Sequence, residues 1–142
     1  MATASRSSTL AAAALLGGLL AGCGGDSEDG SSGGGPTIAD AVDACPPRDN
    51  LARVQVDGPN TVTVVGVPTS DMMELLENQA VAIGTAECLV SELGGPASIG
   101  SRMSTALGAG SAPPDSESWD GFEANWSVDG NSGIFFSIDA RD

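Results

Sequence analysis

The sequence predicts an α+β fold. We expect a four-stranded antiparallel sheet, made of two β-hairpins, with two or three helices inserted between the hairpins to give a two-layer sandwich. Two strand-like pairs of segments flank turn sequences, at residues 51–67 and 122–140. Between them, from residue 71 to 107, apolar residues recur at helical spacing. The chain has 142 residues, which suits one small domain.

The segment from Ile38 to Asn50 precedes the first strand. It contains Cys45-Pro46-Pro47. Proline lacks an amide hydrogen and disfavours helical conformation in the residue before it, so this tripeptide ends any helix that begins near Ala39. We therefore expect an extended segment or one short helical turn here.

The first hairpin is predicted from two segments rich in Val and Thr, Leu51–Asp57 and Thr61–Val67. Gly58-Pro59-Asn60 lies between them and is typical of a turn. Along the first segment apolar and polar residues alternate, which predicts a strand with one buried face.

Two helices are predicted to follow. Ser70 can cap the first, with Asp71 and Glu74 in its first turn. Gly84 interrupts the pattern and Thr85 can cap a second helix over residues 86–93. We prefer this break because one continuous helix would point Cys88 away from its apolar face. The apolar face of the first helix contains Met72, Leu75, Leu76, Gln79 and Ile83.

A third, short helix is predicted from Pro96 to Leu107, because Ile99, Met103 and Leu107 recur at intervals of four. Residues 108–118 are rich in Gly, Ser and Pro and are expected to form a flexible surface loop. Residues 122–128 and 134–140 then alternate apolar and polar side chains around a Gly- and Asn-containing turn at residues 129–133. This is the clearest hairpin in the chain.

Composition excludes several functions. The chain has 19 acidic and 5 basic side chains, a net charge of −14 and no histidine. Nucleic acid is not expected as a partner, because phosphate binding needs clustered Lys and Arg. Without histidine or lysine, the commonest catalytic base, Schiff-base chemistry and the usual nitrogen ligands of zinc are missing. We expect no catalytic residues, no metal site and no cofactor.

The first 22 residues have the pattern of a secretory signal peptide. A short polar start with Arg6 is followed by the apolar run Leu10–Leu20, which is too short to span a membrane. Leu20-Ala21-Gly22-Cys23 resembles the lipobox of bacterial lipoproteins. In that family the Cys thiol receives a diacylglyceryl group and cleavage occurs before it. The resemblance implies lipidation at Cys23 and a location on the extracytoplasmic face of the cell membrane.

Residues 24–36 read GGDSEDGSSGGGP and contain no apolar side chain. Such a segment cannot bury enough surface to offset its chain entropy, so a disordered, acidic tether is expected. The predicted organisation is therefore a signal peptide over residues 1–22, a lipidated Cys and tether over 23–36, and one extracytoplasmic α+β domain over 37–142.

Cysteine counting predicts one disulfide. If Cys23 is lipidated, Cys45 and Cys88 remain, and an even pair in an exported protein indicates a bridge. Its closed loop of about 44 residues is worth roughly 4 kcal/mol in the chain-entropy model. The alternatives are two free buried thiols or a reactive Cys, although a catalytic Cys needs a base and the chain has no histidine.

A second resemblance concerns the folded domain. Gly84-Thr85, then Leu93-Gly94-Gly95-Pro96, then a strand bearing Trp126 occur in an order similar to that of two groups of exported proteins. These are the small lipoproteins of the SmpA/OmlA outer-membrane assembly type and the β-lactamase-inhibitor-protein-like domains. Both are non-enzymatic and bind other proteins, which implies an envelope protein as partner.

The function predicted from these observations is a membrane-anchored, non-catalytic binding or envelope-associated module. Among the five aromatic residues, Trp119 and Phe135 are the candidates for an exposed contact patch, while Trp126, Phe122 and Phe136 are expected in the core. The alternative is a small hydrolase that uses paired carboxylates. Asp129–Gly133 faintly resembles a calcium loop but lacks the later bidentate Glu, so a plain hairpin turn is expected.

Overall fold

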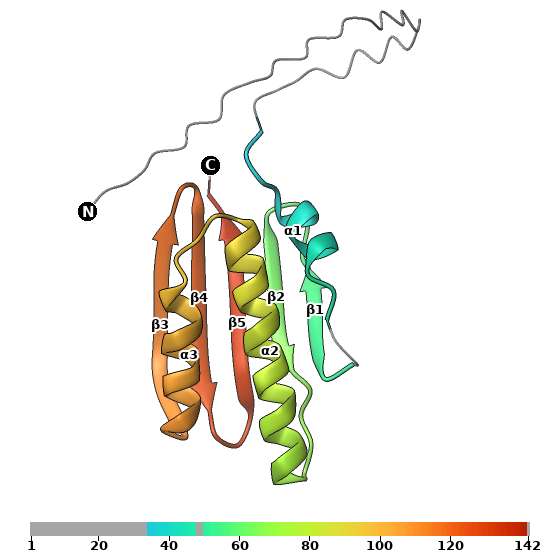
Figure 1. Ribbon diagram of the computed structural model, residues 1–142, viewed down its shortest axis with the longest axis vertical. Coiled ribbons are helices and arrows are strands. Elements are labelled where there is room, and N and C mark those ends of the chain that lie inside the picture. Colours follow the sequence, from blue (N-terminus) through green and yellow to red (C-terminus); the bar gives the residue numbers. More distant parts are fainter. Residues whose placement is uncertain (1–33, 48–49, 142) are drawn as a thin grey trace, which may run out of the picture. The chain divides into compact units, whose positions relative to one another are not determined.

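The computed structural model describes residues 34–47 and 50–141 (Figure 1). The described part of the chain contains three helices and five strands. In chain order they are α1 (Ile38–Ala44), β1 (Ala52–Val56), β2 (Thr61–Gly66), α2 (Met72–Glu92), α3 (Ser98–Gly108), β3 (Ser111–Trp119), β4 (Phe122–Asp129) and β5 (Gly133–Ala140).

The strands form one antiparallel sheet in the order β1-β2-β5-β4-β3. α2 and α3 lie side by side over one face of this sheet, and α1 packs against α2 (Figure 1). The predicted α+β class with an antiparallel sheet and helices between two hairpins is therefore confirmed. The predicted number of strands is wrong, because the sheet has five strands instead of four.

The additional strand is β3, in the segment that was expected to be a loop. It pairs with β4 through a tight turn at Asp120 and Gly121, whose φ angles are 26° and 86°. Positive φ at both central positions belongs to the hairpin turns that suit the twist of a sheet, and Asp-Gly is a preferred sequence for them. Pro113 and Pro114 are tolerated because β3 is an edge strand, with a bulge between Ala112 and Asp115.

α2 is one continuous helix of 21 residues, so the predicted break at Gly84 is wrong. A glycine inside a helix costs about 1 kcal/mol relative to alanine. Burial of residues on both sides of it, including Ile83 and Leu89, outweighs that cost. Thr85 does not cap a helix. Its hydroxyl donates to the carbonyl of Val81 within α2.

The ends of the helices also differ from expectation. Asp71, and not Ser70, caps α2, because its carboxylate accepts from the amides of Met73 and Glu74. α1 has seven residues, more than the single turn expected, and is capped by Thr37, whose hydroxyl accepts from the Asp40 amide. It ends immediately before Cys45-Pro46, as the effect of proline on the preceding residue requires.

The core lies between the helices and the face of the sheet that they cover. Phe136, Ile138, Leu89 and Ile99 have no measurable exposure there, and Trp126 is 3% exposed. Trp119 packs at the edge of this core. Its indole N–H donates to the carbonyl of Leu93 over 3.0 Å, and its ring lies against Gly95, where a Cβ would approach the ring to 2.6 Å.

The predictions for residues 1–33, including the signal peptide and lipidation at Cys23, lie outside the described residues. Gly34–Pro36 have no regular secondary structure, and the folded part begins at the Thr37 cap. Within residues 34–47 and 50–141, no helix combines the length and hydropathy needed to cross a bilayer.

Candidate functional site

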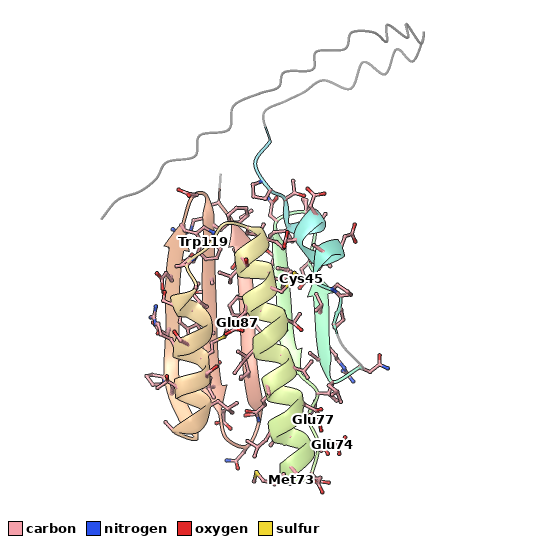
Figure 2. The ribbon with its side chains drawn as sticks, in the orientation of Figure 1. Cys45, Met73, Glu74, Glu77, Glu87 and Trp119 are labelled. Atoms are coloured by element: carbon pink, nitrogen blue, oxygen red, sulfur yellow. A yellow bond between two sulfur atoms is a disulfide. The ribbon has the colours of Figure 1, made fainter. Side chains whose placement is uncertain are left out.

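Cys45 and Cys88 are joined in a disulfide, with their Cα atoms 5.8 Å apart. Cys45 is the C-cap of α1 and is 3% exposed, whereas Cys88 is half-buried on the flank of α2. α1 packs on this flank, so a continuous α2 still brings the two sulfur atoms together. Figure 2 shows Cys45 where α1 meets α2. The bridge ties the short N-terminal helix to the helical layer.

The face of the sheet opposite α2 and α3 is not covered by any helix of the described residues (Figure 1). We call it the open face. The strand registers place three rows of side chains on it: Arg53, Val65, Phe135 and Ser127; then Gln55, Thr63, Ser137, Asn125 and Ser116; then Thr61, Asp139, Glu123 and Ser118. Around Phe135 on β4 and β3 the side chains are short and neutral, and Phe135 itself is a large ring, 48% exposed on β5, the central strand.

A hollow of about 340 Å³ lies beside Phe135 on the open face, which we call the Phe135 hollow. The bulge in β3 creates room for it, because two residues, Pro113 and Pro114, occupy the space opposite Ser127 alone. The hollow is lined by Pro114, Asp115, Ser116, Asn125, Trp126, Ser127 and Phe135.

A second hollow of about 560 Å³ lies on the other side of the bulge, between α3 and β3. Arg102 of α3 and Asp115 of β3 are the charged residues in its lining. The guanidinium pairs with Asp115 and, over 2.6 Å, with Glu117, and its carbon lies 4.7 Å from the centre of the Trp126 ring. These two carboxylates are neighbours on one face of β3, but Arg102 binds both and leaves neither as an unpaired acid or base.

Trp119 and Phe135, the two residues predicted to form a contact patch, lie on opposite faces of the sheet. Trp119 is on the helix-covered face and is partly buried, with its N–H satisfied by Leu93. Phe135 is on the open face. The structure therefore does not bring them together. The residues that do accompany Phe135 are Ser127, Asn125 and Ser116, which sequence reasoning did not select.

Other apolar surface occurs at the start of α2, where Met72, Met73 and Leu76 are 63%, 76% and 44% exposed. Figure 2 shows Met73 at this end of the helix, with Glu74 and Glu77 nearby along the same helix. A groove of about 850 Å³ also runs between residues 44–47 and α2, with small residues such as Ala80 and Gly84 in its lining. Neither surface carries a cluster of polar groups that would define a ligand.

The turn at residues 129–133 is a hairpin turn, as expected. The carboxylate of Asp129 accepts from the backbone amides of Asn131 and Ser132 over 2.8 and 2.9 Å. Gly133 has a φ of 93°, which its missing side chain permits. In the described residues, no three Cys, Asp or Glu side chains lie close enough together to hold a metal ion.

Asp129 gives a prediction for the dependence of stability on pH. Hydrogen bonds from the Ser132 amide, then the Asn131 amide, then the Ser132 hydroxyl hold the pKa of Asp129 below its ordinary value of 3.8. A lowered folded-state pKa stabilises the fold above the unfolded-state value and loses that stabilisation as pH falls through the folded-state value. We therefore expect Asp129→Asn to remove part of the acid destabilisation between about pH 5 and 2. Urea unfolding of both proteins across this pH range tests it. If the free energy of unfolding falls equally with pH in the two proteins, the prediction is wrong.

Comparison with protein-family models, curated proteins and solved structures finds no match to this chain. The candidate site is therefore defined by its own geometry, as an aromatic ring and neutral polar side chains around a bulge on the open face.

Proposed function

We propose that this protein is an exported, lipid-anchored binding module, attached to the membrane at Cys23, whose ligand surface is the open face around Phe135. The observation that carries the binding role is the half-exposed Phe135 ring at the centre of a sheet face that no described helix covers. A ligand that covers the exposed part of this ring removes apolar surface from water, which favours binding.

The placement rests on the sequence. The apolar run ending in Leu20-Ala21-Gly22-Cys23 supports lipidation, and a disulfide between the two remaining cysteines is typical of an oxidising compartment. Stable anchoring needs two or more acyl chains, at roughly 0.8 kcal/mol per buried CH₂. The acidic segment that follows Cys23 is suited to hold the domain away from anionic headgroups.

Replacement of Cys23 by serine is expected to move the protein from the membrane fraction to the aqueous fraction, because serine provides no thiol for lipidation. Detergent phase partitioning of cells that express each form measures this. The matched control is Cys45→Ser with Cys88→Ser, which removes the disulfide and should leave the protein in the membrane fraction. Retention of Cys23→Ser in that fraction would disprove the anchor.

A photocrosslinking side chain at Thr63, on the open face beside Ser137, is expected to form an adduct in intact cells that express the full chain. In that background Phe135→Ser should lower the yield at least fivefold. Met73→Ser, which removes an even more exposed apolar side chain far from this face, should not. Mass spectrometry measures the adduct. An unchanged yield with Phe135→Ser would contradict the role of the open face.

A further inference from the structure

We propose that the Phe135 hollow binds a neutral saccharide chain. This inference rests on the proposed role of the open face as the ligand surface, and it identifies the chemical class of the ligand.

The aromatic wall is the first reason. The ring of Phe135 is 48% exposed and borders the hollow. One face of a pyranose ring presents several C–H groups, and these pack on the electron-rich face of an aromatic ring. Pro114 provides a second apolar surface in the lining. A sugar ring can therefore lie against Phe135 with its polar edge toward the sheet.

The polar lining is the second reason. Ser116, Asn125 and Ser127 occupy adjoining positions on β3 and β4 and line the hollow. Each of these side chains can both donate and accept hydrogen bonds, as sugar hydroxyls do. Ser116 is exposed, and Asn125 and Ser127 are half-buried, so solvent reaches these positions. They are therefore available to several neighbouring hydroxyl groups of one ligand.

Charge selects against anions. No basic side chain lines the hollow, and the one carboxylate in its lining, Asp115, pairs with Arg102 from the helix-covered side. The whole chain carries a net charge of −14, which repels phosphates, sulfates and acidic lipids. A ligand that binds here gains from ring stacking and neutral hydrogen bonds, which a neutral saccharide supplies.

Size and shape agree with a chain of sugars. The volume of about 340 Å³ is near the lower end of the range for ligand pockets, roughly 300–1,000 Å³. Asn125 in its lining is the register partner of Ser137, which in turn pairs with Thr63, so a row of short side chains leads from the hollow across the sheet. One sugar unit can occupy it while the rest of the chain lies across the sheet.

The test measures binding of the full chain, in detergent, to immobilised neutral tetrasaccharides of glucose, mannose, arabinose and N-acetylglucosamine. We expect at least one to bind. Phe135→Tyr keeps the ring and should retain the affinity within about threefold, whereas Phe135→Leu, which keeps an apolar side chain without a ring, should lose at least tenfold. Asn125→Ala should lose at least fivefold, and Met73→Ala, at the distant end of α2, should change nothing.

Binding of none of the four tetrasaccharides overturns the saccharide assignment. Equal affinity of the Phe135→Leu and Phe135→Tyr proteins also overturns it, since an apolar contact alone would then explain binding. A protein adduct from the Thr63 crosslinker together with no saccharide binding would reject the saccharide and leave the open face as the ligand surface. No adduct and no saccharide binding would reject both.

Discussion

Replacing Cys45 and Cys88 together by serine is expected to lower the free energy of unfolding by about 4 kcal/mol, because the unfolded chain regains the conformations that a loop of about 44 residues excludes. This is a large fraction of the stability of a small domain. The effect should be concentrated at α1, a helix of seven residues that is too short to be stable without tertiary contacts and packs on α2.

Urea unfolding of the full chain, with and without reductant, measures this effect. Reductant should lower the midpoint of the native protein to that of the double serine variant and should leave the variant itself unchanged. Hydrogen exchange should show the largest loss of protection at residues 38–44. A loss of stability below about 1 kcal/mol would mean that α1 is held by packing and that the bridge adds little.

Phe136→Ala is expected to cost roughly 3–5 kcal/mol, whereas Phe135→Ala on the same strand should cost less than about 1 kcal/mol. Phe136 has no exposed surface and lies between Val64 and Trp126 on the helix-covered face. Its removal leaves a cavity that packed neighbours only partly fill. Phe135 faces the opposite way and is 48% exposed.

This adjacent pair is its own control, because both substitutions remove the same ring from the same strand. The shift of each urea midpoint gives the loss of stability, provided that the slope of the unfolding free energy against urea concentration is unchanged. Equal losses would contradict the assignment of a covered and an open face to the sheet.

The two hairpins at residues 51–67 and 122–140 could be predicted from local sequence, because alternation and turn residues act between neighbours in the chain. β3 could not be recognised by the same alternation. The positions that face the helices include Asp115 and Glu117, which look like surface residues until Arg102 of α3 pairs with both. The Asp120-Gly121 turn was the one local signal for β3. The prolines before it favoured a loop, so the turn was not interpreted as part of a hairpin.

The continuity of α2 is a second case in which local preference was overruled. Gly84 lowers helix stability locally, but the sheet beneath α2 buries apolar residues on both sides of it. The pairing of Cys45 with Cys88 could be predicted by counting cysteines. The expectation that one continuous helix would keep Cys88 away from Cys45 was wrong, because α1 packs against the flank of α2 and not against its apolar face.

The candidate site was predicted only in part. Phe135 was selected correctly as a residue on the uncovered side of its strand, because alternation places it opposite Ile134 and Phe136. Its companions in the Phe135 hollow come from β3 and β4, and the hollow exists only because β3 joins the sheet and bulges at Pro113-Pro114.

By itself, the sequence determined the α+β class, both apolar hairpins, the pairing of Cys45 with Cys88 and the side of β5 on which Phe135 lies, since each depends on neighbouring residues or on a simple count. Only the tertiary structure decided that a fifth strand completes the sheet, that α2 runs unbroken, and that Trp119 and Phe135 lie on opposite faces. Those outcomes depend on burial and ion pairing between segments far apart in the chain, and these contacts outweigh the local preference of any single residue.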